Sequence, residues 1–190
     1  MNRRNTLTSI SIYTLLISVF ILTGSANAKQ GIQIKDIYFP QSHTFENHQF
    51  ELSGAGILTW GILVDLYAAA LYTSRQEKRE DQRLVIHYLI PIKATKIKQV
   101  AESFIRRQQG PEKLERMRPA LDQLHNAMQD VKPGDRYVLT LKDNNRLVLE
   151  FNDSEVITLN DPLLAEAYLN IWLGKDPIDK SLKISLLGQT

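Results

Sequence analysis

The central pattern of the chain is a long apolar run, Gly54 to Tyr72, in which Asp65 is the only charged residue. Its length approaches the about 20 apolar residues that cross a bilayer. Three glycines divide the run, a charge in lipid is costly, and polar residues follow from Ser74. We therefore predict two buried strands joined by a turn near Gly61 within a soluble domain. The Ala68–Ala70 triplet fits a helix better than a strand, because alanine prefers helices.

Further strands are predicted where apolar and polar residues alternate, or where short apolar runs are bounded by turn residues. They cover residues 32–39, 43–52, 83–91, 136–141, 146–151 and 156–159. The second of these contains a turn candidate at Asn47-His48, which would make it a small hairpin. The 83–91 segment is apolar on both faces, so we expect it at the centre of the sheet, covered on each side. The charged residues 76–82 predict a solvent-exposed connecting loop.

Helices are predicted where apolar residues recur three and four positions apart. A first amphipathic helix covers 94–109 and a second covers 112–129, with a kink or break expected at Pro119. A third begins at Asn160-Asp161-Pro162, a capping residue followed by proline, and ends at Gly174. Strands and helices are segregated along the chain, which predicts an α+β fold with helices on one face of a largely antiparallel sheet.

Residues 1–28 have the pattern of a secretory signal peptide. Arg3 and Arg4 form a basic start, an apolar core covers 10–22, and Ala26-Asn27-Ala28 is an A-x-A cleavage site. We expect cleavage after Ala28, a single mature domain of residues 29–190, and a periplasmic or secreted location without a stable membrane anchor. The alternative is an uncleaved anchor helix, for which the apolar core is short.

Charge adds little to this picture. The chain has 23 Lys and Arg against 21 Asp and Glu, and removal of Arg3 and Arg4 makes the mature chain formally neutral. This balance gives no reason to expect nucleic acid or an anionic membrane as a partner. Basic residues concentrate between 93 and 118. They indicate either an anion-binding patch or, as we favour, the solvated faces of two helices.

Catalytic motifs are not evident in the sequence. The chain has no cysteine and no G-x-S-x-G motif, and its four histidines do not have the spacing of metal ligands. No cofactor or metal site is therefore predicted. Gly54-Ala55-Gly56 indicates a bulge or close backbone packing, with a backbone that borders a ligand pocket as the alternative. His87 is either a hydrogen-bonded core residue or a ligand contact, and Asp65 marks either a cavity mouth or a strand end.

Several segments, taken in order, resemble the chalcone isomerase-like family, and particularly its small exported bacterial members. These segments are GAGILTW followed by VDLYAAALY within 54–72, LVIHYLIPI (84–92), IKQVAESF (97–104), KPGDRYVLTL (132–141) and LLAEAYLNIWLG (163–174). The resemblance covers almost the whole mature chain. It implies an open-faced β-sandwich, in which a large antiparallel sheet is covered by helices and a ligand cleft lies between the layers.

The resemblance also implies where a site would lie. Plant chalcone isomerases close a flavanone ring with an Arg after the G-A-G turn, a Thr on the next strand, a Tyr and an Asn on the following helix, and a Thr in the last helix. The corresponding residues here are Leu58 (or Thr59 if the alignment slips by one), Tyr67, Lys96, Ser103 and Ile171. The missing guanidinium would have stabilised a phenolate or enolate, so chalcone isomerase activity is not expected.

Non-catalytic plant relatives bind fatty acids, and hold the carboxylate with the same Arg and a Tyr on the following strand. Tyr67 fits that Tyr position, and Lys96 is a candidate to supply the missing charge. Our leading hypothesis is therefore an exported, non-enzymatic protein that binds a small apolar or fatty-acid-like ligand in the cleft. The candidate ligand-binding residues are Leu58, Thr59, Tyr67, His87, Lys96, Ser103 and Ile171.

Two alternatives remain. One is an isomerase or lyase with a rebuilt site, in which Tyr67 or His87 acts as acid or base. The other is a cell-envelope structural or partner protein whose cleft is closed by its own side chains, with Trp60, Phe104 and Tyr168 among the fillers, together with Trp172. A cavity of about 300 Å³ or more would favour a ligand over this closed core.

Overall fold

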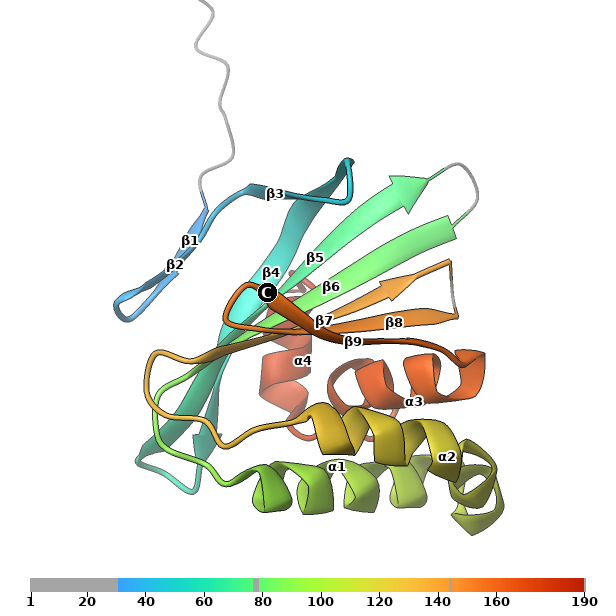
Figure 1. Ribbon diagram of the computed structural model, residues 1–190. Coiled ribbons are helices and arrows are strands. Elements are labelled where there is room, and N and C mark those ends of the chain that lie inside the picture. The colour runs from blue at the N-terminus through green and yellow to red at the C-terminus, as the bar shows by residue number, and fades with distance from the viewer. Residues whose placement is uncertain (1–30, 77–78, 144, 190) are drawn as a thin grey trace, which may run out of the picture.

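The computed structural model describes residues 31–76, 79–143 and 145–189, which fold around a curled, seven-stranded antiparallel sheet (Figure 1). The predicted signal peptide lies outside the described residues. The sheet order is β3-β4-β5-β6-β7-β8-β9, and β1 and β2 form a separate two-stranded hairpin. The strands are β1 Ile32–Ile34, β2 Ile37–Phe39, β3 Ser42–Phe45, β4 His48–Trp60, β5 Val64–Gln76, β6 Arg79–Tyr88, β7 Arg136–Lys142, β8 Arg146–Phe151 and β9 Ser154–Asn160. The helices are α1 Ala94–Gln109, α2 Pro111–Ala127, α3 Pro162–Leu173 and α4 Lys180–Leu186.

This architecture confirms the α+β prediction, with helices α1, α2 and α3 gathered on one face of the sheet (Figure 1). The predicted central hairpin is confirmed as well, since β4 and β5 pair from Glu51–Thr73 to Trp60–Val64 around the turn at Gly61. The alanine triplet lies in β5 and is fully buried. Ala69 faces the helices, whereas Ala68 and Ala70 face the opposite side of the sheet. Because these side chains are small, the residues that pack on each face of the sheet can approach β5 closely.

Two local predictions are wrong, and one of two alternatives at a third position is excluded, each for an identifiable reason. Residues 32–39 form two strands, because Lys35 has a positive φ of 52° and reverses the chain. The charged 76–82 segment is mostly strand: β5 runs to Gln76 and β6 begins at Arg79, and these two residues pair with each other. Of the kink or break expected at Pro119, the break does not occur: helix α2 continues through this residue, because its buried face, which includes Met117 and Leu121, packs into the core.

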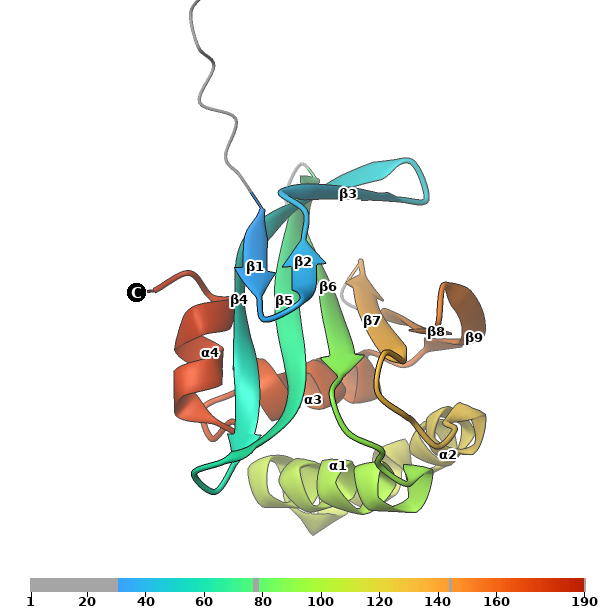
Figure 2. The ribbon, with the colours of Figure 1, turned by 90° about the vertical axis from the view of Figure 1, so that its left-hand side faces the viewer.

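Helix α4 explains the glycines of the central strand. A β-carbon built on Gly54 would lie 2.0 Å from the carbonyl oxygen of Ser185, and one built on Gly56 would lie 2.8 Å from the Ser185 β-carbon. Only glycine lets the helix approach the strand this closely. Figure 2 shows α4 beside β4. The glycines therefore serve close backbone packing.

The alternation of side chains along the strands divides the core in two. The larger cluster lies between the sheet and the helices and includes Leu84, Ile86 and Leu139. A smaller cluster covers the far face of the sheet, where Phe39 of β2 and Phe50 of β4 pack around Val85 and Val138. Figure 2 shows the β1–β2 hairpin in front of β4 and β5. The central strands are thus covered on both faces, as predicted for residues 83–91.

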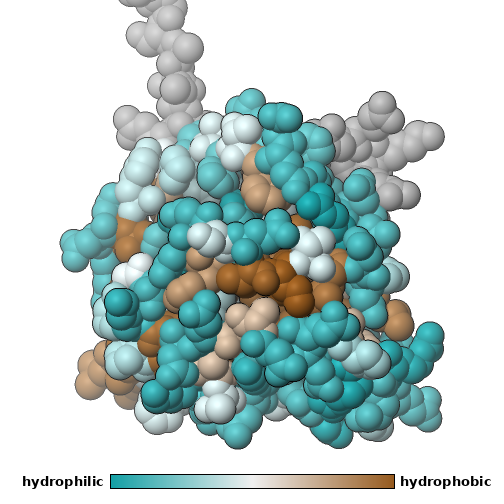
Figure 3. Space-filling view, viewed as in Figure 1, coloured by the Kyte–Doolittle hydropathy of each residue, from teal (hydrophilic) through white to brown (hydrophobic). Residues whose placement is uncertain are grey.

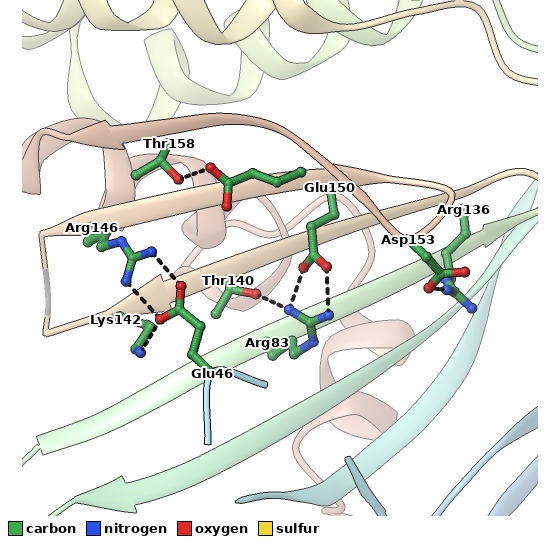
Figure 4. A network of polar contacts seen from close by, with 10 residues as sticks. Glu46, Arg83, Arg136, Thr140, Lys142, Arg146, Glu150, Asp153 and Thr158 are labelled. Atoms are coloured by element: carbon green, nitrogen blue, oxygen red, sulfur yellow. Dashed lines mark hydrogen bonds and ion pairs between the residues drawn. The ribbon is translucent and has the colours of Figure 1, made fainter. Parts of the chain in front are cut away.

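Polar side chains complete the cover of the far face (Figure 4). Arg83 is buried and donates to Glu150 at 2.5 and 3.2 Å and to the Thr140 hydroxyl at 2.6 Å. Its guanidinium also lies 4.3 Å from the ring centroid of Phe45 on β3. This group ties β6, β7 and β8 together beneath the β3–β4 hairpin.

A second ion-pair group fixes the tip of the β3–β4 hairpin. Glu46 and Asn47 form this turn, both with positive φ, one position earlier than predicted. The Glu46 carboxylate accepts from Lys142 at 2.6 Å and from Arg146 at 2.5 and 2.8 Å. These contacts join the hairpin to β7 and β8 across the sheet (Figure 4).

Removal of one partner of the buried Arg83–Glu150 pair should be strongly destabilising. Glu150→Ala leaves the Arg83 guanidinium uncompensated, and we expect a loss of about 3–5 kcal/mol in the free energy of unfolding, measured by urea denaturation. Glu115→Gln, which removes an exposed partner of Arg118, is the control and should cost far less. The double variant Arg83→Met/Glu150→Leu should recover most of the loss. Equal losses for Glu150→Ala and Glu115→Gln would contradict this account.

The Glu46 contacts should make stability depend on pH in the acid range. Hydrogen bonds from Arg146 and Lys142 lower the pKa of Glu46 from 4.5 to about 2. Its contribution is therefore complete above about pH 4.5 and is lost as pH falls towards 2, because the unfolded chain takes up the proton first. Glu46→Gln should be less stable than wild type at neutral pH, and the difference should shrink across this window. Glu166→Gln, which removes an exposed carboxylate from α3, controls for net charge. A difference that is constant with pH would refute the assignment.

Candidate functional site

A cavity of about 600 Å³ lies between the sheet and helices α1 and α3. Strands β4 to β8 supply one wall, and the other is supplied by α1, α3, Met128 after α2, and the segments at 90–92 and 178–179. Most of the wall is aliphatic or aromatic. These apolar residues are Leu58, Trp60, Leu66, Ile86, Ile90, Pro91, Ile92, Ile97, Val100, Ala101, Phe104, Met128, Leu139, Leu149, Ile171, Trp172 and Ile178. The volume falls within the about 300–1,000 Å³ typical of small-molecule sites.

The cavity contradicts the idea of a closed core. The four large side chains proposed as fillers, those of Trp60, Phe104, Tyr168 and Trp172, all lie in its wall and leave the space between them open. Trp60 is also 73% exposed, so the cavity reaches the molecular surface near the end of β4.

The polar groups of the wall are mainly tyrosine hydroxyls. Tyr67 and Tyr88 are directly paired across β5 and β6, so both rings point to the helix side, with centroids 5.8 Å apart. The Tyr67 hydroxyl accepts a hydrogen bond from the Trp172 indole at 2.8 Å and keeps its own proton to donate. The Tyr88 hydroxyl has no hydrogen-bond partner among the described residues. Two hydroxyl donors therefore remain for a bound molecule.

The other two tyrosines of the wall are engaged elsewhere. The Tyr137 hydroxyl accepts from the backbone N–H of Gln129 at 2.6 Å and donates to its carbonyl at 3.1 Å. The Tyr168 hydroxyl lies 3.6 Å from the sulfur of Met128. These contacts orient the two rings, which leaves Tyr67 and Tyr88 as the hydroxyls with free hydrogen-bonding capacity.

Burial keeps these hydroxyls protonated. Desolvation raises the pKa of Tyr67 and of Tyr88 well above the ordinary value, and the nearby Asp179 carboxylate raises the pKa of Tyr67 further. Desolvation likewise raises the pKa of Tyr168. A general base needs a pKa near the working pH, so these side chains are suited to donating hydrogen bonds rather than to abstracting protons.

Charged groups lie only at the edges of the cavity. Among the described residues in its wall, Lys96 and Asp179 are the only ones with a charged side chain. Asp179 caps α4 by accepting from the Leu182 N–H at 2.7 Å. Lys96 is exposed on the first turn of α1 and has no ion-pair partner among the described residues. Lys96 is therefore the free cation at the cavity mouth.

The structure brings five of the seven predicted site residues together. Leu58, Thr59, Tyr67, Lys96 and Ile171 line the cavity. Asp65, which the sequence placed at either a cavity mouth or a strand end, accepts from the Thr59 hydroxyl at 2.6 Å and forms an ion pair with Lys35.

His87 and Ser103 do not belong to the cavity wall. His87 alternates with Ile86 and Tyr88 on β6 and therefore faces the far side, where its ring meets Phe39 edge-on at 5.5 Å. Burial lowers the pKa of His87 to about 4. Ser103 lies on the exposed face of α1, and its hydroxyl donates to the Val100 carbonyl at 2.7 Å. Neither residue can contact a molecule in the cavity.

Tyr88 has a free hydroxyl in the cavity wall but is not among the seven predicted site residues. Side chains alternate between the two faces of a strand, so if His87 lies on the far face, Tyr88 must lie on the helix face with Tyr67. This alternation is the feature of the sequence from which Tyr88 could have been selected. Arg83 is a buried arginine on the same strand as Tyr88. Its side chain faces away from the cavity, towards Glu150. It therefore does not replace the cation that is missing after the G-A-G turn.

Two other kinds of site are not found within the described part of the chain. No group of three His, Cys, Asp or Glu side chains there is placed to hold a metal ion. Among those residues, no helix has both the length and the apolar character needed to cross a membrane.

Comparisons with known proteins agree with this geometry. The model of the chalcone isomerase-like family matches residues 31–188. Among solved structures, the fold is similar to the crystal structure of the Arabidopsis thaliana fatty-acid binding protein AtFAP1, with a TM-score of 0.63 and 13% identity. That similarity covers 80% of this chain and 92% of the Arabidopsis chain. A search of curated protein sequences finds no match. At this level of identity the structural similarity establishes the fold alone.

Proposed function

The chain belongs to the chalcone isomerase-like family, and from this premise we propose that it is an exported, non-catalytic member that binds a small apolar or amphipathic ligand of the fatty-acid type. The observation that carries the proposal is the cavity of about 600 Å³, which is apolar on most of its wall and holds two tyrosine hydroxyls free to donate. The similar Arabidopsis protein is a fatty-acid binding protein, which supports the same class of ligand.

The distribution of polar groups orients the proposed ligand. Its apolar body lies between β4–β8 and the helices, where burial of each CH₂ contributes about 0.8 kcal/mol. An acceptor group deep in the cavity accepts from the Tyr88 hydroxyl, and Tyr67 is the second donor. Lys96 at the cavity mouth attracts a negatively charged head group as the ligand enters and Asp179 repels it, whereas the bound head group lies at the tyrosine hydroxyls.

The same groups argue for binding rather than turnover. The wall contains neither a histidine nor a buried cation, and its tyrosines are held in the protonated state. An enolate or phenolate formed in the cavity would therefore meet hydroxyl donors but no guanidinium and no base to generate it. The rebuilt-enzyme alternative also loses His87, which lies on the far face.

We expect the purified protein to bind long-chain fatty acids. Native mass spectrometry should detect a copurifying or added fatty acid in a one-to-one complex. Addition of ligand at about 100 times its dissociation constant should raise the free energy of unfolding by about 2.7 kcal/mol, visible as a rise in melting temperature. If no lipid copurifies and neither fatty acids nor polyphenols change the melting temperature, the proposal fails.

Tyr88→Phe should weaken ligand binding by loss of one hydrogen bond. A net hydrogen bond is worth about 0.5–1.5 kcal/mol, and about 1.5–3 kcal/mol to a charged acceptor, so we expect a loss of affinity of about 2-fold to 150-fold, measured by calorimetry. Tyr72→Phe is the matched control, because Tyr72 is also a buried tyrosine of the central strands but lies on the far face. Equal affinities for the two variants would show that Tyr88 is not the polar anchor.

A further inference from the structure

The tip of the central hairpin carries a group of apolar side chains that the fold itself does not use. Trp60, Ile62, Leu63 and Val64 are 73%, 92%, 89% and 40% exposed, and Gly61 completes the turn. Exposed apolar residues normally occur singly on soluble proteins, so a continuous run of this kind marks an interaction site. We call residues 60–64 the hairpin tip.

The hairpin tip projects from the sheet beside the cavity mouth. In Figure 1 the β4–β5 turn extends beyond the other strands at the lower left, next to the beginning of α1. Figure 3 shows apolar surface at the same margin of the molecule. Trp60 belongs both to the tip and to the cavity wall, and Lys96, at the start of α1, lines the cavity as well. A surface that covers the tip therefore also faces the mouth.

The base of the hairpin tip is held in place. Gly61 has a φ of +64°, the left-handed conformation that lets the chain reverse sharply. Just below the turn, Asp65 accepts from the Thr59 hydroxyl at 2.6 Å and pairs with Lys35 of the β1–β2 hairpin. The apolar side chains are thus presented outwards by a fixed turn, which lowers the entropic cost of docking.

We propose that the hairpin tip docks the protein on a phospholipid surface with the cavity mouth facing the lipid, so that an acyl ligand passes directly between membrane and cavity. The second half of this inference rests on the proposed function; the docking itself does not. In this arrangement Ile62 and Leu63 enter the boundary between head groups and acyl chains. Trp60 lies at head-group depth, where tryptophan is enriched, and Lys96 faces the phosphates.

Shape and charge favour lipid over a protein partner. A stable protein interface buries about 800 Å² on each side, which a five-residue turn does not provide, whereas a bilayer receives a small convex apolar tip without matching its shape. The ammonium of Lys96 complements lipid phosphate, whereas Lys35 is paired with Asp65 below the turn and Lys93 is paired with Asp130. Apolar insertion should therefore dominate, and one free lysine should make binding to an anionic surface about fivefold tighter than to a neutral one.

Vesicle cosedimentation tests the docking. Wild type should bind phosphatidylcholine vesicles, and bind more tightly when part of the lipid is phosphatidylglycerol. Ile62→Ser/Leu63→Ser should lose on the order of tenfold or more in the partition coefficient, because two aliphatic side chains no longer enter the lipid. Ile184→Ser, which alters an exposed aliphatic residue on α4, is the matched control and should bind like wild type. All forms share one N-terminus, so any contribution of that segment cancels in the comparison.

Brominated lipids give an independent readout, since they should quench the fluorescence of Trp60 on docking and quench a Trp60→Phe variant less. Circular dichroism and melting temperatures show whether the variants are folded. If wild type fails to bind vesicles, or the tip variant binds as tightly as wild type, the proposal is wrong. If the tip substitution leaves vesicle binding unchanged but converts an oligomer to a monomer in sedimentation velocity, the tip is a protein contact and the proposal is also wrong.

Ligand assays separate this inference from the proposed function. The tip variant should bind a fluorescent fatty acid in solution with unchanged affinity, but should take it up from donor vesicles on the order of tenfold more slowly. Failure of wild type to bind the fatty acid in solution would refute the proposed function while leaving vesicle docking to be judged by its own result. Equal uptake rates for wild type and tip variant would refute the transfer step.

Discussion

Coverage of the central strands on both faces is the constraint from which the other features follow. Strands β4, β5 and β6 carry apolar side chains on each face, and each face needs its own layer. On the far face the layer is thin: the β1–β2 and β3–β4 hairpins pack around Phe39 and Phe50. Ion pairs then replace apolar contacts farther along the sheet: a buried pair between Arg83 and Glu150, and a more exposed group in which Glu46 joins β7 and β8. The cavity described above lies on the opposite, helix side of the sheet.

On the helix side, the helices cover the sheet incompletely, and a space remains between the sheet and helices α1 and α3. Helix α4 lies directly on the glycines of β4, whereas α1 and α3 stand off the sheet and leave the cavity. The residues that face this space are mostly apolar, and the hydroxyls among them are kept protonated by burial. The wall offers hydrogen-bond donors and hydrophobic area, and none of the described residues that line it is a histidine. Those properties suit retention of an amphipathic molecule.

Local elements of the fold could be predicted from the sequence more accurately than pairings between distant segments. Helix α1 and the β7–β8 hairpin follow from local periodicity and turn residues, and appear almost as predicted. The charged residues around 79–82 were misread because their strand pairing depends on neighbouring strands, not on their own composition. Pro119 predicts a kink or break in α2; the helix is not broken there, because its packing outweighs one missing hydrogen bond. His87 was selected because of its chemistry, although its strand position already placed it opposite Tyr88.

The sequence by itself determined the family, the order of the elements, the central hairpin and the absence of a cation after the G-A-G turn, because each of these is written in local patterns of side chains. Only the tertiary structure decided that an open cavity separates the helices from the sheet, that Tyr67 and Tyr88 share it, and that Arg83 is turned away from it. The physical reason is that cavities and side-chain facing depend on distances between layers, which are set by contacts between residues far apart in the chain. The exposure of Ile62 and Leu63 is of the same kind, since an apolar run does not reveal which of its members will lie at a turn outside the core.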